Sequence, residues 1–123
     1  MAKTILVVDD SGTVRQQVSM ALKQAGFAIV EAADGQEALA AIDSNRAIDM
    51  VVCDVNMPVL NGLEMVEQVK RNPDNKSLPI LMLTTEGQPS MIKRAKEAGA
   101  VGWIVKPFDA SQLVQTAKHL TKT

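Results

Sequence analysis

The sequence predicts an α/β fold, a doubly wound open sheet of five parallel strands in one domain. Five short apolar runs alternate with amphipathic stretches along the 123 residues. Four of these runs are nearly continuous in Val, Ile, Leu and Met, which is typical of strands covered on both faces. Strands that alternate with helices pair in parallel through right-handed crossovers. Five such units cannot close an eight-stranded barrel, so we expect an open sheet.

The expected elements alternate strictly between strand and helix. We predict strands at residues 5–8, 28–30, 50–55, 80–84 and 101–105. The first helix is indicated by apolar residues at helical spacing, namely Val14, Val18, Ala21, Leu22 and Ala25, and Gly26 is expected to end it. The fourth helix is predicted from about residue 89 to residue 98, with Gly99 after it.

The other three helices are predicted from their N-terminal caps. In each, a capping residue is followed three positions later by Glu or Gln: Asp34 and Glu37, Asn61 and Glu64, Asp109 and Gln112. This spacing is typical of a capping box, in which the two residues satisfy each other's backbone N–H groups. We therefore expect helices to begin just after residues 34, 61 and 109.

Composition argues against several classes of function. The net charge is −1, from 13 basic and 14 acidic residues, which gives no electrostatic basis for binding nucleic acid. The single cysteine, Cys53, cannot form an internal disulfide and is typical of a reducing compartment. The apolar run at residues 5–8 is far too short for a signal peptide or a membrane span. We therefore expect a cytoplasmic, monomeric protein with one domain, residues 1–123.

Four of the predicted strands end in residues that can carry chemistry: Asp9 and Asp10, Asp54, Thr84 with Thr85, and Lys106. The carboxyl ends of parallel strands meet at one edge of an open sheet, and ligands bind there. We therefore expect carboxylates, hydroxyls and an ammonium group to converge at this edge.

Three crowded carboxylates repel one another unless they take up protons or share a cation. An all-oxygen ligand set with open positions suits Mg²⁺ better than zinc, and Mg²⁺ also binds phosphate oxygens. A phosphoryl group at Asp54 would meet Mg²⁺ on one side and Lys106 on another, with Asp54 as the carboxylate nucleophile. The pattern therefore predicts one Mg²⁺ ion and a phosphorylatable Asp54.

The motifs around these residues are Val7-Val8-Asp9-Asp10, Asp54-Val55-Asn56-Met57-Pro58 with Gly62 after it, Thr84, and Lys106-Pro107-Phe108. Together they resemble the receiver domain of bacterial two-component response regulators over the whole chain. The segments Ala33-Asp34-Gly35 and Asn61-Gly62-Leu63-Glu64 are most similar to the single-domain response regulators of chemotaxis. The resemblance implies a flavodoxin-like (βα)₅ fold with strand order 2-1-3-4-5 and without an output domain.

The resemblance assigns roles to the acidic residues. It implies that Asp54 is the phosphoacceptor and takes its phosphoryl group from a phosphohistidine on a sensor histidine kinase. Asp10 and Asp54 are expected to ligate Mg²⁺ together with the backbone carbonyl of Asn56. Asp9 is expected to act through water and through its charge. The chain would catalyse its own phosphoryl transfer and slow autodephosphorylation without being a conventional enzyme.

Further residues are implied to hold the phosphoryl group and to switch. Lys106 is expected to pair with the phosphoryl oxygens, and a cis Lys106–Pro107 bond, frequent in the family, would aim its amine into the site. Thr84 is expected to hydrogen-bond one of these oxygens, and a ring on the fifth strand then fills the space behind Thr84. The family usually has Tyr or Phe at that position; here it is Trp103, whose indole is larger than phenol and has a donor but no acceptor.

The remaining expectations concern turnover and partners. Asn56 and Glu86 flank the path of the hydrolytic water and are expected to tune dephosphorylation. The output surface is expected on the fourth helix, the fifth strand and the last helix, with contacts at Ile92, Lys96, Trp103, Val105 and Gln112. The implied partners are the kinase, a flagellar motor switch protein and a phosphatase, with neither nucleic acid nor a membrane among them.

Other functions fit the residues less well. A Mg²⁺-dependent hydrolase of the aspartyl-phosphate type needs a second acid and a lid or cap domain, and no insertion here is long enough. A flavodoxin-like cofactor binder needs a phosphate-cradling loop after the first strand, where Asp9-Asp10-Ser11 places negative charge. A pseudo-receiver that only binds partners would not need the complete set of acids, hydroxyl and lysine. Among receivers, a phosphorelay intermediate or a phosphate sink in another pathway stays open as an alternative.

Overall fold

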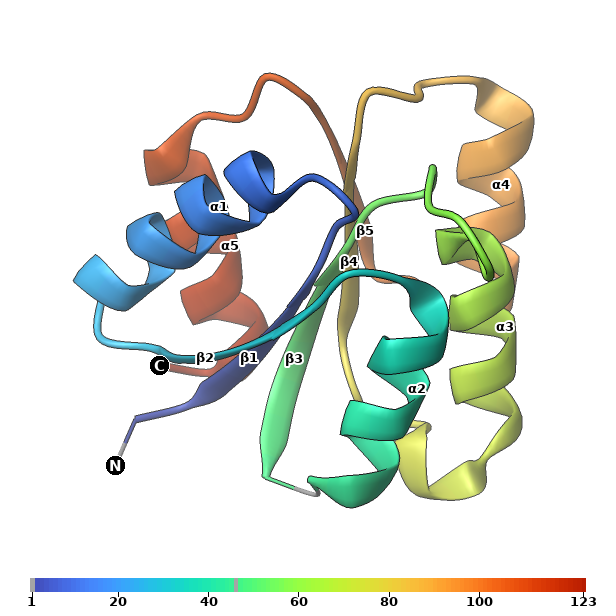
Figure 1. Ribbon diagram of the computed structural model, residues 1–123, viewed down its shortest axis with the longest axis horizontal. Helices are drawn as coiled ribbons and strands as arrows, with labels where there is room; N and C mark the ends of the chain where they lie inside the picture. The colour runs from blue at the N-terminus through green and yellow to red at the C-terminus, as the bar shows by residue number, and fades with distance from the viewer. Residues whose placement is uncertain (1, 46) are drawn as a thin grey trace.

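The computed structural model describes residues 2–45 and 47–123, and within them strands and helices alternate as predicted (Figure 1). The strands are β1 (Thr4–Val8), β2 (Ala28–Ala32), β3 (Ile48–Cys53), β4 (Ile80–Thr84) and β5 (Gly102–Val105). All pair in parallel, and their order in the sheet is β2-β1-β3-β4-β5. The predicted open, doubly wound sheet and its strand order are confirmed.

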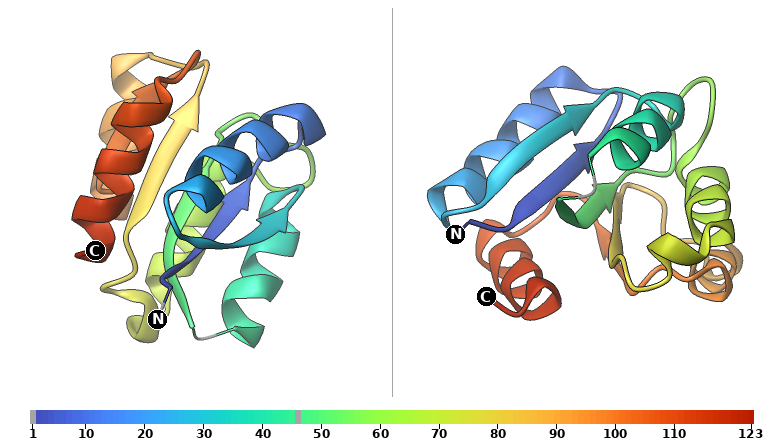
Figure 2. Two further views of the ribbon diagram at one scale, coloured as in Figure 1. Left: turned by 90° about the vertical axis from the view of Figure 1, so that its left-hand side faces the viewer. Right: turned by 90° about the horizontal axis from the view of Figure 1, so that it is seen from below.

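The helices form one layer on each face of the sheet. They are α1 (Gly12–Gln24), α2 (Gly35–Ser44), α3 (Gly62–Arg71), α4 (Pro89–Ala98) and α5 (Ala110–Thr121), with a short 3₁₀ turn at Pro73–Asn75. Helices α1 and α5 cover one face, and α2, α3 and α4 cover the other (Figures 1 and 2). Among the described residues, no helix is both long enough and apolar enough to span a bilayer.

Alternate residues of each central strand enter two separate cores. In β1, Ile5 and Val7 pack with residues of α1 and α5, whereas Leu6 and Val8 pack with residues of α2 and α3. All four are at most 1% exposed. Burial of such a side chain contributes about 1.5–3 kcal/mol, so both faces of the strand stabilise the fold. This double burial explains why the apolar runs are continuous rather than alternating.

The third strand ends at Cys53, two residues before the predicted boundary at Val55. The reason lies in Asp54, whose Oδ1 accepts hydrogen bonds from the backbone N–H groups of Val55 (2.7 Å) and Asn56 (3.4 Å). These two N–H groups bond to a local side chain, so the chain turns away from the sheet at the phosphoacceptor candidate.

The three predicted caps form, but only one is a reciprocal box. Asn61 accepts from the Glu64 N–H and Glu64 accepts from the Asn61 N–H, as expected. Asp34 caps the Glu37 N–H, yet the Glu37 carboxylate accepts from the N–H of Ala33, one residue before the cap. At α5, the carboxylate of Asp109 accepts from the N–H groups of Ser111 and Gln112.

Candidate functional site

Strand order brings the predicted site residues to the carboxyl edge of the sheet, at the top of Figure 1. Strands β1 and β3 are neighbours, and Val8 pairs with Cys53. The next residues along the chain, Asp9 and Asp54, therefore lie side by side. Strands β4 and β5 are neighbours too, and the Lys106 N–H donates to the Thr84 carbonyl at 2.8 Å. The Lys106–Pro107 bond is cis, as expected.

The three acids form a compact cluster. One carboxylate oxygen from each of Asp9, Asp10 and Asp54 lies within 4.8 Å of the other two. Asp9 and Asp54 are buried, at 4% and 6% exposure, whereas Asp10 is exposed. Buried carboxylates this close are unfavourable unless positive charge is at hand.

Lys106 supplies part of that charge. Its Nζ lies 2.7 Å from Asp9 Oδ2 and 3.3 Å from Asp54 Oδ2, with only 13% of the side chain exposed. Burial by itself lowers the pKa of the Lys106 ammonium, but the hydrogen bond to Asp9 and the charges of Asp54 and Asp9 outweigh it, so the pKa is raised. The lysine is therefore charged at neutral pH.

One ammonium does not neutralise three carboxylates, so the edge keeps an excess of negative charge. The donors are all hard oxygens, and exposed Asp10 leaves one side of the cluster open to solvent. This donor set fits Mg²⁺, which takes one or two carboxylates and keeps several waters. The residues present therefore fit the expected cation.

Glu86 connects three of the other predicted residues. Its backbone N–H donates to Oγ1 of the fully buried Thr84 at 3.3 Å, and its backbone carbonyl accepts from Trp103 Nε1 at 2.8 Å. Its carboxylate accepts from Asn56 Nδ2 at 2.7 Å. A movement of the segment that contains Glu86 would therefore act on the hydroxyl, the indole and the residue beside Asp54 together.

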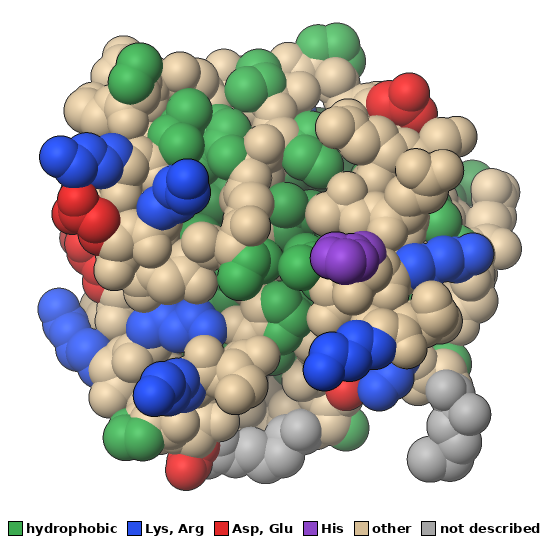
Figure 3. Space-filling view, turned by 180° about the vertical axis from the view of Figure 1, so that it is seen from behind, with side chains coloured by type: hydrophobic (Ala, Val, Ile, Leu, Met, Phe, Trp, Pro, Cys, Tyr) green, Lys and Arg blue, Asp and Glu red, His purple; other side chains and the backbone are tan. Residues whose placement is uncertain are grey.

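The predicted output residues lie on one side of the molecule but do not share one pocket. Ile92, Lys96 and Trp103 line a cavity of about 290 Å³ between α4 and β5. Val105 is 49% exposed on β5, and Gln112 is exposed in the first turn of α5. Figure 3 shows hydrophobic side chains in a band between groups of Lys and Arg on this side.

Sequence reasoning missed the residues that hold Asp9 in place. Arg15 Nη1 donates to the Asp9 carbonyl at 2.7 Å, and its Nε lies 3.3 Å from Glu31 Oε1. The Ser11 N–H donates to Asp9 Oδ1 at 2.9 Å. Arg15 lies in a helical stretch rich in polar residues, so only the docking of α1 beside β1 could show its role.

Cys53 precedes the phosphoacceptor candidate and is completely buried. Burial raises the pKa of its thiol, and the negative charges of Asp54 and Asp9 raise it further. The thiol therefore stays protonated and packs as a small apolar group, with its Sγ 3.7 Å from the Met65 sulfur.

The fold, together with the acids, Thr84 and Lys106 at the carboxyl edge of the sheet, is typical of one class of protein. Residues 5–118 match the family model of the response regulator receiver domain, and the chain belongs to this family. Receiver domains are signalling switches rather than conventional enzymes. They bind Mg²⁺ at an acidic pocket and work with a histidine kinase.

Within the family, the chain is similar to single-domain chemotaxis proteins. It is 40% identical to chemotaxis protein CheY1 of Helicobacter pylori over 105 residues, which is 85% of either chain. It is 36% identical to the CheY homolog of Campylobacter jejuni over 120 residues, 97% of this chain and 92% of the relative. The solved structure of the chemotaxis response regulator CheY4 of Vibrio cholerae superposes with a TM-score of 0.90 at 44% identity and covers 98% of this chain and 99% of that one.

Proposed function

We propose that this chain is a phosphorylation-activated switch in which Asp54 accepts a phosphoryl group from the phosphohistidine of a sensor histidine kinase. The observation that carries the proposal is the position of Lys106, whose ammonium bridges Asp9 and Asp54 inside an otherwise acidic edge. In phosphoryl transfer, catalysis is mostly positioning and charge stabilisation, and this edge supplies both.

The two oxygens of Asp54 have different surroundings. Oδ1 accepts the backbone N–H groups of Val55 and Asn56, whereas Oδ2 faces Lys106. In our proposal, Oδ2 attacks phosphorus, an O–P bond forms, and the P–N bond of the phosphohistidine breaks with the electron pair going to the imidazole. The Lys106 ammonium then gives up its contact with the Asp54 carboxylate and pairs with the phosphoryl oxygens.

The proposed metal ligands are Asp10, Asp54 and the backbone carbonyl of Asn56, with Asp9 acting through water. A bound Mg²⁺ ion would neutralise charge on the transferred group. Asp9 also holds the Lys106 ammonium at 2.7 Å, so it keeps the lysine beside the reacting oxygen.

Switching would begin at Thr84. Its hydroxyl accepts from the Glu86 N–H and has a proton left to donate to a phosphoryl oxygen. An inward shift of Thr84 would pull the Glu86 backbone with it. The Glu86 carbonyl would then pull the Trp103 indole, which is hydrogen-bonded to it. Trp103 lines the cavity beside α4, so the change reaches the proposed output face of α4, β5 and α5.

We propose chemotaxis as the pathway and a flagellar motor switch protein as the target, in a cytoplasmic single-domain monomer. The similarity to chemotaxis proteins over nearly the full length of both chains supports this choice. A phosphatase would be a further partner. The alternative is a phosphorelay intermediate or a phosphate sink, which would use the same site with different partners.

The site is tested with acetyl phosphate and MgCl₂, followed by intact-protein mass spectrometry. The wild type is expected to gain one phosphoryl group, whereas Asp54→Asn is expected to gain none and Asp43→Asn, an exposed control on α2, to behave like the wild type. The fluorescence of Trp103, the single tryptophan, is expected to change only where mass is gained. Labelling that persists in Asp54→Asn would refute the proposal.

The output is tested separately with a peptide of a flagellar motor switch protein. Binding to the phosphorylated chain is expected to be tighter than binding to the unmodified chain, and Ile92→Ala is expected to weaken it. Equal binding of both forms would exclude the motor switch as the target and favour the relay or sink.

A further inference from the structure

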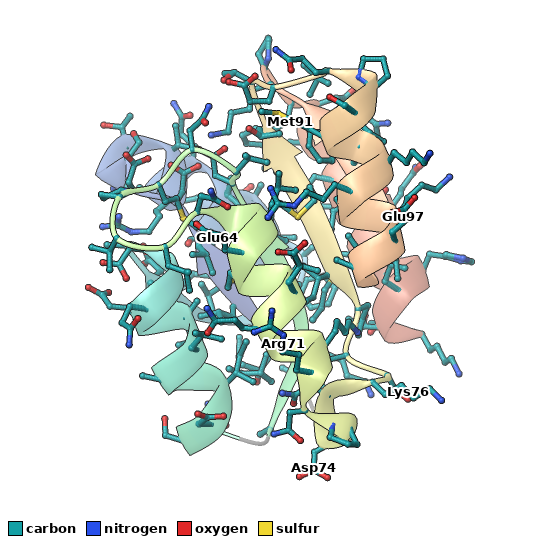
Figure 4. The ribbon with its side chains drawn as sticks, turned by 90° about the vertical axis from the view of Figure 1, so that its right-hand side faces the viewer. Glu64, Arg71, Asp74, Lys76, Met91 and Glu97 are labelled. Atoms are coloured by element: carbon teal, nitrogen blue, oxygen red, sulfur yellow. The ribbon has the colours of Figure 1, made fainter. Side chains whose placement is uncertain are left out.

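The loop between β3 and α3, residues 54–61, lies against the N-terminal end of α2 (Figures 1 and 4). The Gly35 N–H donates to the Leu60 carbonyl at 3.3 Å, and Leu60 itself is only 9% exposed. A Cβ on Gly35 would lie 2.5 Å from the Leu60 oxygen and 3.0 Å from the Leu60 Cβ. The loop backbone thus rests directly on the bare Cα of Gly35.

The same loop contains a strained residue. Val59 has φ 70°, a region that β-branched side chains rarely adopt. The Leu60 N–H bonds to the Pro58 carbonyl at 2.7 Å, which closes a three-residue turn around Val59. Val59 is 79% exposed, so its own side chain gains little packing in return. Such strain persists only where neighbouring contacts enforce it, and Leu60 is the adjacent buried residue.

Both ends of the loop are fixed at the phosphoacceptor candidate. At the start, Asp54 Oδ1 holds the N–H groups of Val55 and Asn56. At the end, the Gly62 N–H donates to the Val55 carbonyl at 2.9 Å, and a Cβ on Gly62 would collide with the Asp54 carbonyl. Near the end of the loop, Leu60 is held against α2, and Asn56 lies between Asp54 and Leu60.

We propose that Gly35 is a positioning residue for the loop that carries the Asn56 carbonyl. Its missing side chain lets Leu60 seat against α2 and keeps the Val59 turn in the shape that places Asn56 beside Asp54. Gly35 touches neither a cation nor a phosphoryl group; it acts through Leu60. The inference rests on the proposed function, because it concerns the geometry of the same Mg²⁺ site.

The test compares Gly35→Ala with Gly12→Ala. Both glycines are the first residue of a helix, where Ala is the better helix former, but a Cβ on Gly12 would meet only Arg15 Nη2 at 3.7 Å. Mg²⁺ is titrated while the backbone amides of Val55 and Asn56 are followed by NMR. Hydrogen exchange of the Leu60 amide is measured on the metal-free protein.

Gly35→Ala is expected to bind Mg²⁺ about tenfold more weakly, as when a group that orients a metal ligand is altered. Its Leu60 amide is expected to exchange faster, and Gly12→Ala is expected to match the wild type in both measurements. Wild-type affinity together with wild-type Leu60 protection in folded Gly35→Ala would overturn the inference.

Two further measurements distinguish failure of this inference from misfolding of the variant and from failure of the proposed function. If Gly35→Ala does not fold, Leu60→Ala removes the buried side chain that packs the loop beside Gly35 and is expected to weaken Mg²⁺ binding too. Unchanged affinity in Leu60→Ala would overturn the inference. If the wild type itself binds no Mg²⁺, the proposed function fails. The metal-free exchange of the Leu60 amide then still decides whether Gly35 fixes the loop.

Discussion

The Trp103 indole donates a 2.8 Å hydrogen bond from Nε1 to the backbone carbonyl of Glu86. A phenylalanine ring has no donor for this carbonyl, and a tyrosine would have to reach it with its hydroxyl. Trp103 therefore forms a hydrogen bond with the segment after β4 that Phe could not form. This segment also holds the hydroxyl of Thr84 through the Glu86 N–H.

Trp103→Phe removes the indole N–H, so the Glu86 carbonyl loses this hydrogen bond. We expect the free energy of unfolding to fall by about 1–2 kcal/mol, from the lost hydrogen bond and reduced ring packing. Urea denaturation followed by circular dichroism measures this change. Amide exchange at Glu86 and Gly87 is expected to speed up, whereas Val101→Thr, at an exposed position just before the same strand, should leave it unchanged. Wild-type exchange rates in Trp103→Phe would show that the bond does not hold the segment.

Lys106→Met removes the ammonium between Asp9 and Asp54. We expect Mg²⁺ to bind more tightly, roughly threefold to tenfold, because a cation next to the site no longer repels it. Phosphorylation by acetyl phosphate is expected to slow, because the phosphoryl oxygens lose their partner. Calorimetric titration with MgCl₂ gives the affinity, and the exposed Lys118→Met serves as the control. Weaker Mg²⁺ binding in Lys106→Met would contradict the electrostatic account.

Glu86→Ala frees the Asn56 amide, which is held at 2.7 Å by the Glu86 carboxylate. We expect a shorter phosphoryl lifetime, because water gains access to the phosphorylated Asp54. Glu86→Gln keeps an acceptor oxygen and is expected to restore most of the lifetime. Both are measured as the decay of the mass gain after the phosphodonor is removed. An unchanged lifetime in Glu86→Ala would remove Glu86 from the control of turnover.

The ion pair between α3 and α4 predicts a pH dependence. Arg94 donates to both carboxylate oxygens of Glu67, at 2.9 Å and 3.0 Å, and this bonding lowers the pKa of Glu67. A lowered folded-state pKa gives stability that is present above the unfolded pKa of about 4.3 and is lost as pH falls through the folded value.

The stability difference between the wild type and Arg94→Gln is therefore expected to be small, constant from neutral pH to about pH 5, and to shrink below about pH 4. Urea unfolding across this range measures it, and NMR titration of Glu67 gives the folded pKa. The Arg94 side chain is 48% exposed and the Glu67 side chain 33%, so solvent reaches the pair and added salt should reduce the difference as well. A difference that persists unchanged at pH 3 would contradict the assignment.

Much of the fold could be predicted because it depends on local signals. Continuous apolar runs indicated strands buried on both faces, and residues such as Asn61 with Glu64 indicated where helices begin. These signals involve neighbours within about four residues, so they survive without knowledge of the tertiary structure. Boundaries were predicted less well: β2 continues to Ala32, two residues beyond the predicted end, and β3 ends at Cys53 because the Asp54 carboxylate accepts hydrogen bonds from the N–H groups of the next two residues.

The sequence by itself determined which residues reach the carboxyl edge of the sheet, since that follows from where each strand ends. Only the tertiary structure decided their partners: Lys106 bonds Asp9 more closely than Asp54, Arg15 holds the Asp9 carbonyl, and Gly35 seats Leu60. The physical reason is distance along the chain. Lys106 and Asp9 are 97 residues apart, and no local pattern records a contact that depends on strand order and on the packing of separate helices.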